Sequence, residues 1–548
     1  MKNLKTLCII ALLIVNSVII HAETQDGIQL FKRHYMEKGN YKDMPLPGET
    51  VDQLLLSAAQ GEYEPTMFLM RSAGPVKDVE VVLTNDLECA GHKIDKNSVD
   101  IRVVEDQKRW LDTRRFVREP YLLMKKDRFD LKPDETTRIW LTVHVPSNAA
   151  PGNYSSAIRI NSGNKLLKEI PVTLTVRPFK LLDPGPDKMM RFMYFGNSPL
   201  PVWGRNLEYL TKMYKDMKEH GMNSISCYSG QSMDSKPPAS GTPEKHWSSL
   251  TDVVQAMKAG GLLQKGSAFI WMYAWSFTAP YLTESHAFLE KQGIEVFLYG
   301  QDEPSDKKGQ DSARYVNATA TNSYPKAKMT TAICEDGIKE VGDIHDAWIC
   351  AAMNLNDHMR KLADKKKKIL WSYDCALAPT DPLTSRHYFG FHVWRTGANG
   401  ASLWHYSPGG STRFGLSVKD WDSYNPDYQH PFDFAFCAPA GPIPSVGWEG
   451  VREGVDDYRY IFTLEDYIAR AETAGKSSLA ETGKQLLKEL RSKINPENYR
   501  KAWEVTRGTI GYGYVRPAPE PQLTIQDYDA YRERIAQEII KISKGLEN

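Results

Sequence analysis

The sequence predicts a multidomain protein of β plus α/β class: an N-terminal β-sandwich, a (β/α)8 barrel of the TIM type and a C-terminal helical extension. Three observations support this order. Short alternating segments separated by turns extend to about residue 177, strands alternate with helices after Asp187, and long helical periodicity follows Gly450. The chain has 548 residues, which is enough for two to four domains at about 100–200 residues each.

Positive and negative charges nearly cancel in this chain. Lys and Arg together number 69, Asp and Glu together number 68, and the formal net charge is +1. A protein that binds nucleic acid or an anionic membrane surface usually carries a basic excess or a basic patch. The sequence therefore predicts neither of these partners.

Residues 1–22 have the pattern of a secretory signal peptide. Lys2 and Lys5 form a basic start, an apolar run covers about Leu7–Ile20, and the small Ala22 stands at the expected cleavage point. The alternative is a membrane anchor, but the run is shorter than about 18–20 clean apolar residues. We therefore expect an exported protein, periplasmic or extracellular, and no transmembrane segment after cleavage.

The cysteine and histidine patterns indicate no metal site. Six cysteines follow the signal peptide, with no C-x-x-C spacing, and no H-E-x-x-H motif occurs. The sequence therefore predicts no metal and no cofactor. Both buried thiols and disulfide bridges remain open for the six cysteines, which are Cys89, Cys227, Cys334, Cys350, Cys375 and Cys437.

Residues 23–184 are predicted to form the β-sandwich. The turn at Val145–Tyr154 places two prolines and a glycine between β-forming runs, and Lys180–Asp187, with Pro-Gly-Pro, is the expected linker to the next domain. The clearest predicted strands are Val79–Leu83, Val99–Val104, Thr137–Val145, Ser155–Ile160 and Ile170–Val176.

Residues 188–470 are predicted to form the barrel. A doubly wound open sheet is the alternative, but no G-x-G-x-x-G follows the first strand and no P-loop is present. The clearest barrel helix is Asn206–His220; Thr251–Lys258, Asp311–Thr321 and Asp357–Lys365 show weaker periodicity. The eight predicted strands are Arg191–Phe195, Ser224–Tyr228, Ala268–Tyr273, Glu295–Tyr299, Met329–Ile333, Ala347–Ala351, Ile369–Tyr373 and Ala401–Tyr406.

The C-terminal part is predicted to be helical, with residues 471–548 packed on the barrel. The expected helices are Asp456–Arg470, Ser477–Lys493 and Ile525–Ser543. A basic run at Lys361–Lys368 indicates a solvated helix end. Charged residues around the first of these helices are expected to form pairs on its surface, with a substrate contact as the alternative: Glu449, Arg452, Glu453, Asp456 and Asp457.

The fourth predicted barrel strand leads into two adjacent carboxylates. Gly300 and Gln301 follow Glu295–Tyr299, and Asp302 and Glu303 come next, before a proline. Active sites of such barrels lie at the carboxyl ends of the strands. Two neighbouring like charges raise one pKa, which suits a general acid. A helix cap or a solvated turn is the structural alternative for the same pair.

Aromatic residues at or near other predicted strand ends favour a carbohydrate site. Aromatic rings stack on the C–H faces of sugars, whereas core aromatics are expected in mid-strand. Trp271, on the third strand, belongs to this pattern. The candidate substrate-binding residues are Tyr273, Trp275, Tyr299, Trp371, Tyr373, Trp404 and Tyr406.

These features together resemble glycoside hydrolase family 123. The resemblance is carried by the signal peptide, a sandwich with the turn P-S-N-A-A-P-G-N-Y-S, the sequence Y-G-Q-D-E-P after the fourth strand, and W-E-G-V-R-E-G-V-D-D-Y-R-Y at Trp448–Tyr460. It covers nearly the whole mature chain. It implies an exo-acting β-N-acetylgalactosaminidase with a retaining, substrate-assisted mechanism.

The resemblance also implies roles for the two carboxylates. Glu303 would be the general acid and then the general base. Asp302 would orient the 2-acetamido group as its carbonyl oxygen attacks C1 to give an oxazolinium-type intermediate, and aromatic residues of the seventh and eighth strands would wall the acetamido pocket. A different glycosidase would use Glu303 as acid/base and Asp374 as nucleophile. A secreted protein that binds glycan without cutting it is the non-enzymatic alternative.

Overall fold

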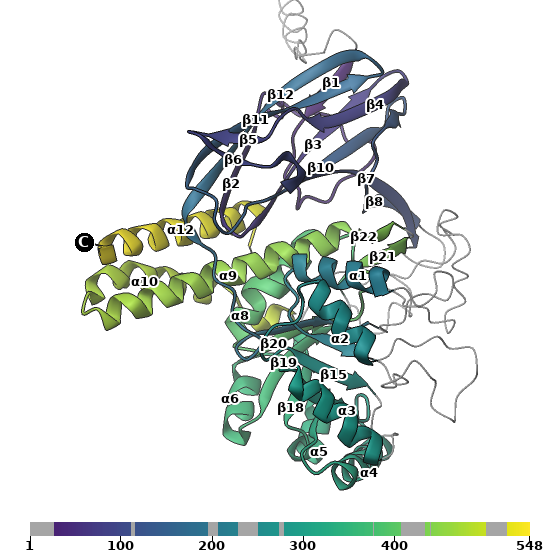
Figure 1. Ribbon diagram of the computed structural model, residues 1–548, viewed down its shortest axis with the longest axis vertical. Helices are drawn as coiled ribbons and strands as arrows, with labels where there is room; N and C mark the ends of the chain where they lie inside the picture. The colour runs from purple at the N-terminus through teal and green to yellow at the C-terminus, as the bar shows by residue number, and fades with distance from the viewer. Residues whose placement is uncertain are drawn as a thin grey trace, which may run out of the picture.

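The computed structural model describes residues 27–110, 116–195, 207–227, 250–272, 279–375, 377–406, 433–438, 440–499 and 523–547. The predicted signal peptide and the candidate residues Tyr273 and Trp275 lie outside these ranges. Figure 1 shows the β-sandwich above the barrel, with helix α9 (Val446–Thr473) crossing between them and helices α10 (Ser477–Lys493) and α12 (Ile525–Glu547) extending to the left. Among the described helices, none combines the length and the apolar character needed to cross a bilayer.

The N-terminal domain is built from two packed β-sheets, as predicted. A five-stranded sheet has the order β1-β3-β10-β7-β8, and the second sheet has the main order β2-β12-β11-β4-β9 with β5 and β6 attached. Apolar side chains from both sheets form one core, which includes Phe68, Ile139 and Leu174. The bounds are β1 Ile28–Phe31, β2 Leu54–Gln60, β3 Tyr63–Ser72, β4 Val76–Leu83, β5 Leu87–Cys89, β6 His92–Ile94, β7 Val99–Trp110, β8 Phe116–Met124, β9 Phe129–Leu131, β10 Thr136–His144, β11 Gly152–Ser162 and β12 Lys165–Lys180.

The second domain is an eight-stranded parallel barrel, which confirms the predicted fold class. The strands follow the order β13-β20-β19-β18-β17-β16-β15-β14, and the first and last are joined where the amides of Asn223 and Ser224 donate to the carbonyl of Arg191. The bounds are β13 Met190–Met193, β14 Ile225–Cys227, β15 Ala268–Met272, β16 Glu295–Tyr299, β17 Lys328–Ala332, β18 Ala347–Ala351, β19 Ile369–Asp374 and β20 Gly400–Leu403.

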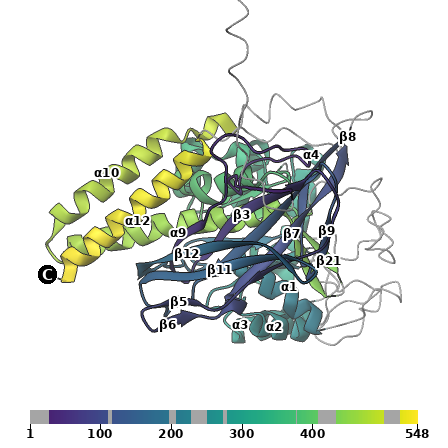
Figure 2. The ribbon, with the colours of Figure 1, turned by 90° about the horizontal axis from the view of Figure 1, so that it is seen from above.

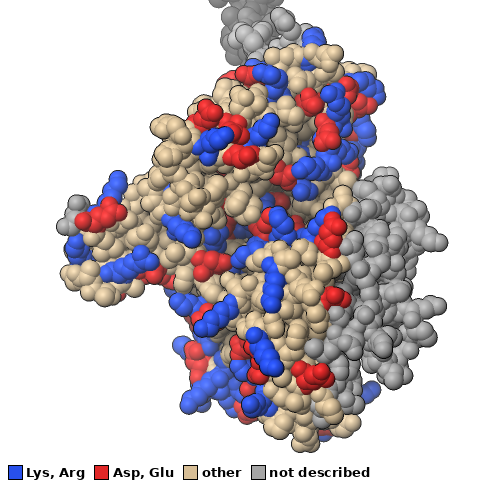
Figure 3. Space-filling view, viewed as in Figure 1, with Lys and Arg blue, Asp and Glu red and all other residues tan. Residues whose placement is uncertain are grey.

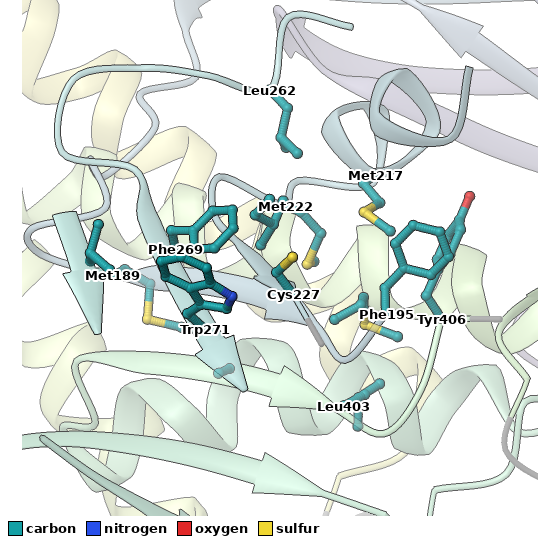
Figure 4. Packing of buried hydrophobic residues seen from close by; sticks show 14 of the residues in the cluster. Met189, Phe195, Met217, Met222, Cys227, Leu262, Phe269, Trp271, Leu403 and Tyr406 are labelled. Carbon is teal, nitrogen blue, oxygen red and sulfur yellow. The ribbon is translucent and has the colours of Figure 1, made fainter. Parts of the chain in front are cut away.

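Side chains of each barrel strand alternate between two cores. One core fills the barrel interior and includes Phe192, Phe297 and Trp371. The other lies between the strands and the surrounding helices, where Figure 4 shows Trp271 and Tyr406 among methionine and leucine side chains. The helices around the barrel are α1 Leu207–Glu219, α2 Leu250–Ala259, α3 Ala279–Lys291, α4 Lys307–Ser323, α5 Glu335–Val341, α6 Asp357–Lys366, α7 Pro382–His387 and α8 Val393–Thr396.

The C-terminal helices pack on the sandwich as well as on the barrel. α9 (Val446–Thr473), α10 (Ser477–Lys493) and α12 (Ile525–Glu547) share one apolar core, and Figure 2 shows them side by side. Arg177 of the sandwich strand β12 donates to Glu533 of α12 at 2.7 Å. The first helix begins ten residues earlier than predicted, because the hydroxyl of Ser445 caps it by accepting from the amide of Trp448.

The charged residues at the start of α9 are buried, so their expected place on the helix surface is wrong. Glu453 and Asp457 are at most 1% exposed. Arg386 of α7 donates to both oxygens of Asp457, and Arg532 of α12 donates to Asp457 at 2.7 Å and to Glu453 at 2.8 Å. Burial of a charge is costly unless it is paired. The partners of Glu453 and Asp457 come from other helices, whereas Glu449 pairs with Arg452 and Asp456 with Arg459 one turn away, as expected. The basic run Lys361–Lys368, in contrast, ends α6 at the surface, as predicted.

Three glycines allow α9 to lie against the backbone of the segment that contains α7. A Cβ atom added to Gly447, Gly450 or Gly454 would lie 2.2–2.6 Å from the carbonyl oxygens of Pro379, Pro382 and Arg386 respectively. The glycines are three and four residues apart, so they share one face of the helix. The G-V-R-E-G part of the distinctive segment Trp448–Tyr460 therefore has a packing role.

We expect Gly450→Ala to lower the melting temperature, although alanine favours helix over glycine by about 1 kcal/mol. The new methyl group would lie 2.2 Å from the carbonyl oxygen of Pro382, and overpacking of this kind costs about 1–3 kcal/mol or more when it meets backbone. Calorimetry of the two proteins measures the difference. Gly74→Ala is the control, because a Cβ there meets no heavy atom within 4 Å. A Gly450→Ala protein as stable as the parent would contradict the close packing.

Candidate active site

The turn that carries Asp302 and Glu303 lies at the carboxyl end of β16 and is fixed to its neighbours. The hydroxyl of Thr331 donates to the carbonyl of Gln301 at 2.6 Å, and the amide of Glu303 donates to the carbonyl of Ala332 at 3.1 Å. On the other side, Ser312 of α4 donates to the side-chain oxygen of Gln301 at 2.7 Å. The pair therefore stands where barrel active sites are built, on a turn held by β17 and α4.

Glu303 has a backbone conformation that is rare for a residue with a side chain. Its φ is +41°, in the left-handed region, which costs on the order of 1–3 kcal/mol for a residue other than glycine. The turn keeps this conformation because the amide of Glu303 is bonded to β17 and its carbonyl accepts from the amide of Ser305 at 2.7 Å. Such strain concentrates at functional sites.

Asp302 is held by a tyrosine from the strand that precedes it. The hydroxyl of Tyr299 donates to Oδ1 of Asp302 at 2.5 Å and accepts from the amide of Ala332 at 2.9 Å. Tyr299 is 1% exposed and lies in the barrel interior. Desolvation raises the pKa of Asp302, the hydrogen bond from Tyr299 lowers it, and the charge of Glu303 raises it; the net direction is upward.

Glu303 has a tyrosine partner of its own, from β19. The hydroxyl of Tyr373 donates to Oε1 of Glu303, and desolvation followed by the charge of Glu303 raises the pKa of Tyr373, so this phenol stays protonated and remains a donor. Each carboxylate is therefore oriented by a separate hydroxyl, one from strand four and one from strand seven.

A further tyrosine lies at the mouth of the barrel, which is the carboxyl end of the strands where Asp302 and Glu303 stand, and it was not among the predicted site residues. Tyr194 follows β13, and its ring meets that of Tyr299 edge to face, with centroids 6.5 Å apart. It also raises the pKa of Tyr373 through its charge when ionised, which places it near both tyrosines. The signal was present in the sequence, because Tyr194 is the fourth residue of the predicted strand Arg191–Phe195.

The structure separates the other candidate aromatic residues into two groups. Trp404 directly follows β20, is partly buried and packs against the interior cluster, as Tyr373 does. Trp371 lies deeper in the interior against Phe297, with ring centroids 4.7 Å apart, and is 3% exposed. Tyr406 is fully buried outside the barrel wall, where its hydroxyl donates to Asp216 at 2.7 Å. Tyr373 is thus brought to Glu303 and Trp404 to the interior cluster, while Trp371 and Tyr406 belong to cores.

Asp374, the alternative nucleophile, points away from the barrel interior. Its Oδ2 accepts from the hydroxyl of Tyr499 at 2.6 Å and its Oδ1 from the amide of Leu377 at 3.1 Å. Neighbouring residues of a strand face opposite sides, so Asp374 lies outside the wall while Tyr373 lies inside. Asp374 is only 6% exposed, and its carboxylate accepts hydrogen bonds from Tyr499 and Leu377, which hold it in place.

The arrangement suits proton transfer and electrostatic orientation. Two carboxylates share one mouth, one with an upward-shifted pKa and both with fixed hydroxyl donors. Within the part of the chain that the structure describes, no three His, Cys, Asp or Glu side chains gather closely enough to hold a metal ion. The described residues of the site therefore offer acid/base chemistry from side chains.

Comparison with known proteins agrees with the motifs. Residues 47–162 match the family model of the glycoside hydrolase 123 N-terminal domain. A search of curated proteins gave no match. A family 123 glycoside hydrolase from Clostridium perfringens, studied for glycolipid glycan hydrolysis, has a similar structure, with a TM-score of 0.66, 15% sequence identity, and coverage of 95% of this chain and 99% of that chain.

Other solved structures are similar at lower TM-scores. A family 39 glycoside hydrolase from Bacteroides cellulosilyticus WH2 has a TM-score of 0.35 and 11% identity, covering 74% of this chain and 82% of its own. A family 2 β-galacturonidase from Eisenbergiella tayi has a TM-score of 0.34 and 10% identity, covering 72% and 69% respectively. The resemblance to family 123 is confirmed by the match of residues 47–162 to the N-terminal domain of that family, and the Clostridium perfringens structure shows that the fold is shared over nearly the whole chain.

We expect Tyr299→Phe to raise the pKa of Asp302. The lost hydroxyl stabilises the ionised carboxylate, and a hydrogen bond to a charged group is worth about 1.5–3 kcal/mol, which corresponds to about one to two pKa units. Carbon-13 NMR titration of the labelled carboxyl groups measures the shift. Tyr315→Phe, an exposed tyrosine on α4, is the matched control. An unchanged or lowered pKa of Asp302 in Tyr299→Phe would show that the hydroxyl does not hold it.

Proposed function

We propose that this protein, with its family 123 N-terminal domain and barrel, is an exported, retaining glycoside hydrolase that removes β-linked N-acetylgalactosamine from glycans by substrate-assisted catalysis. The observation that carries the proposal is the pairing of two adjacent mouth carboxylates with separate tyrosine hydroxyls, while Asp374 of strand seven is turned away. A two-carboxylate mechanism with Asp374 as nucleophile would need that side chain to face the sugar.

In this proposal, Glu303 transfers the protons. It protonates the glycosidic oxygen as the bond to the leaving group breaks, and then accepts a proton from the water that opens the intermediate. The hydrogen bond from Tyr373 fixes the direction of its carboxyl group. The left-handed backbone of Glu303 supports the same role, because it presents this side chain toward strand seven rather than along strand four.

Asp302 orients the acetamido group of the substrate. Its carboxylate accepts the amide N–H, so the carbonyl oxygen of the same group attacks C1, and its negative charge stabilises the positive charge that develops on the oxazolinium ring. The hydroxyl of Tyr299 donates a hydrogen bond to Oδ1 of Asp302, which leaves Oδ2 to accept from the substrate amide. Tyr373 and Trp404 provide the aromatic wall beside this position.

The substrate is a carbohydrate, and we place the protein in the periplasm or outside the cell because of the predicted signal peptide. The Clostridium perfringens enzyme is described for glycolipid glycan hydrolysis, which supports glycans with a terminal amino sugar as the class to test here. The choice of N-acetylgalactosamine over N-acetylglucosamine rests on one hydroxyl configuration, which one or two hydrogen bonds in the mouth would read.

The purified mature protein is expected to hydrolyse aryl β-N-acetylgalactosaminide and to leave aryl β-galactoside intact. Substrate assistance requires the acetamido carbonyl, which the galactoside lacks. Release of the aryl alcohol, measured on both substrates and on the α- and N-acetylglucosamine counterparts, gives the specificity. Equal turnover of the galactoside would overturn the substrate-assisted mechanism, and binding without product on every substrate would indicate a glycan-binding protein.

Two variants separate the carboxylate roles in the same assay. Glu303→Gln is expected to lower kcat/KM by about 10²–10⁴, the usual contribution of a general acid or base. Asp302→Asn is expected to lower it by about 10²–10³, as for the loss of one electrostatic stabiliser. Glu335→Gln, a carboxyl group at the first turn of α5, is the control and should retain parental turnover. Parental turnover in Asp302→Asn would mean that this residue is not the orienting group.

A further inference from the structure

A cavity lies between the sandwich and the barrel, apart from the candidate active site. This cleft, called the waist cleft, has a volume of about 490 Å³, within the range of about 300–1,000 Å³ that small-molecule sites occupy. Figure 3 shows acidic and basic side chains gathered along this waist. Six of the residues that line it are Tyr63, His144, Ser147, Lys180, Arg452 and Asp456.

The waist cleft is separate from the Asp302–Glu303 mouth. At the barrel side of the cleft, Lys218 lies in the last turn of α1 and Gly221 lies between the end of α1 and the start of β14. Residues between a helix and the next parallel strand stand at the amino end of the barrel, whereas the mouth is at the carboxyl end. A ligand in this cleft therefore does not compete for the two carboxylates.

Two buried polar residues of α9 line the cleft, and each has one atom without a hydrogen-bond partner. Arg452 is 6% exposed and Asp456 is 2% exposed. Among the described residues, Nε of Arg452 and Oδ2 of Asp456 have no hydrogen-bond partner, although both residues are otherwise anchored, Arg452 to Glu449 and Asp456 to Arg459 at 2.6 Å. An unpaired buried donor and an unpaired buried acceptor each cost about 1–3 kcal/mol. Both atoms are shielded from solvent, so a polar molecule in the cleft would relieve this cost once the two side chains turn toward it.

The sandwich side of the cleft adds a flat, half-buried aromatic surface. Tyr63 and His144 stack with their centroids 4.2 Å apart and 14° between the rings, and the guanidinium of Arg452 lies 5.2 Å from the Tyr63 centroid. Burial lowers the pKa of His144, so its imidazole is neutral at pH 7. Ser147 forms the exposed rim of the cleft and lies in the turn Val145–Tyr154, which the catalytic proposal leaves unexplained.

The charges around the cleft are largely paired with one another. Asp183 binds Arg191 at 2.5 Å and lies 3.8 Å from Lys218, and Glu219 binds Lys215. The lining holds four basic and three acidic side chains, most of them in ion pairs, so little net charge is left to attract a phosphate or carboxylate ligand. The groups left for a ligand are therefore a mixture of donors and acceptors beside aromatic rings, which matches the alternating hydroxyls and C–H faces of a sugar.

We propose that the waist cleft binds a neutral saccharide, as a second carbohydrate site that is distinct from the catalytic mouth. Asp456 and His144 accept from sugar hydroxyls, and Arg452 and Lys180 donate to them. A site of this kind would hold one part of a glycan, or a second glycan, on the face of the molecule opposite to the mouth. The proposal is independent of which glycosidic bond the mouth cleaves.

The test is histidine-selective NMR of the full mature chain, with imidazole carbons labelled and the His144 signal assigned by its loss in His144→Gln. Galactose, N-acetylgalactosamine and N-acetylglucosamine are titrated separately into the protein. A saturable shift of the His144 signal by at least one sugar is expected. In Ser147→Trp, a bulky side chain at the exposed rim fills the cleft, so this shift should be lost, while Ser147→Ala should retain it.

Activity on aryl glycosides is measured for the same two Ser147 variants and should equal that of the parent, since the mouth is at the other end of the barrel. The absence of a His144 shift with all three sugars would overturn the proposal. A shift caused by sodium phosphate and not by sugars would also overturn it and assign the cleft to anions. Because the NMR signal reports only the cleft, a failure of the proposed hydrolysis would be seen separately in the activity assay.

Discussion

The three parts of this molecule depend on one buried group of ion pairs. Arg532 of α12 reaches Glu453 and Asp457 of α9, and Arg386 of α7 completes the contact with Asp457. The sandwich joins the same network where the hydroxyl of Tyr460 on α9 donates to Glu62 at 2.6 Å. Removing one partner from such a buried group leaves an uncompensated charge, which costs about 3–5 kcal/mol.

This network makes α9 the central element of the fold. At its N-terminus, the capping residue Ser445 forms an isolated β-bridge with Leu122 of the sandwich strand β8. The face of α9 that carries the three glycines lies on the backbone around α7, and the later turns of α9 pack against α10 and α12. The helix also follows the eighth barrel strand in the chain. The sandwich is therefore tied to the barrel through buried charge and close backbone contact, not only through the Lys180–Asp187 linker.

The sequence allowed prediction of all eight barrel strands to within one to three residues at their ends, because short β-forming runs alternate with helical segments and turn signals. The start of α9 could not be predicted, because Gly447, Gly450 and Gly454 lower the helix propensity of this segment. These glycines are needed for close packing against the segment that contains α7, and that contact exists only in the folded protein. The acids of the same helix were expected on its surface for a related reason. A charged residue is normally exposed, and the arginines that pair with Glu453 and Asp457 are far away in the sequence.

The site residues were likewise predictable only where the pattern is local in the sequence. Asp302 and Glu303 could be located because they are adjacent and follow a strand, but the tyrosines that orient them depend on strand parity and on neighbours across the barrel. Parity alone could have excluded Asp374 from the interior: strands alternate sides, so it cannot face inward together with Tyr373. Trp271 is outside for the same reason, since Met272 of its strand lies in the interior core.

The backbone at Glu303 explains how two adjacent residues can have different tasks. In an extended strand, neighbouring side chains would point to opposite faces, and only one would reach the mouth. The turn after Gly300 and the φ of +41° at Glu303 allow both carboxylates to reach it, with Asp302 bonded to Tyr299 of strand four and Glu303 to Tyr373 of strand seven. Burial raises the pKa of Asp302, the hydrogen bond from Tyr299 lowers it and the charge of Glu303 raises it, while each carboxylate keeps a hydroxyl donor of its own. A strained turn thus makes one carboxylate available for orientation and the other for proton transfer.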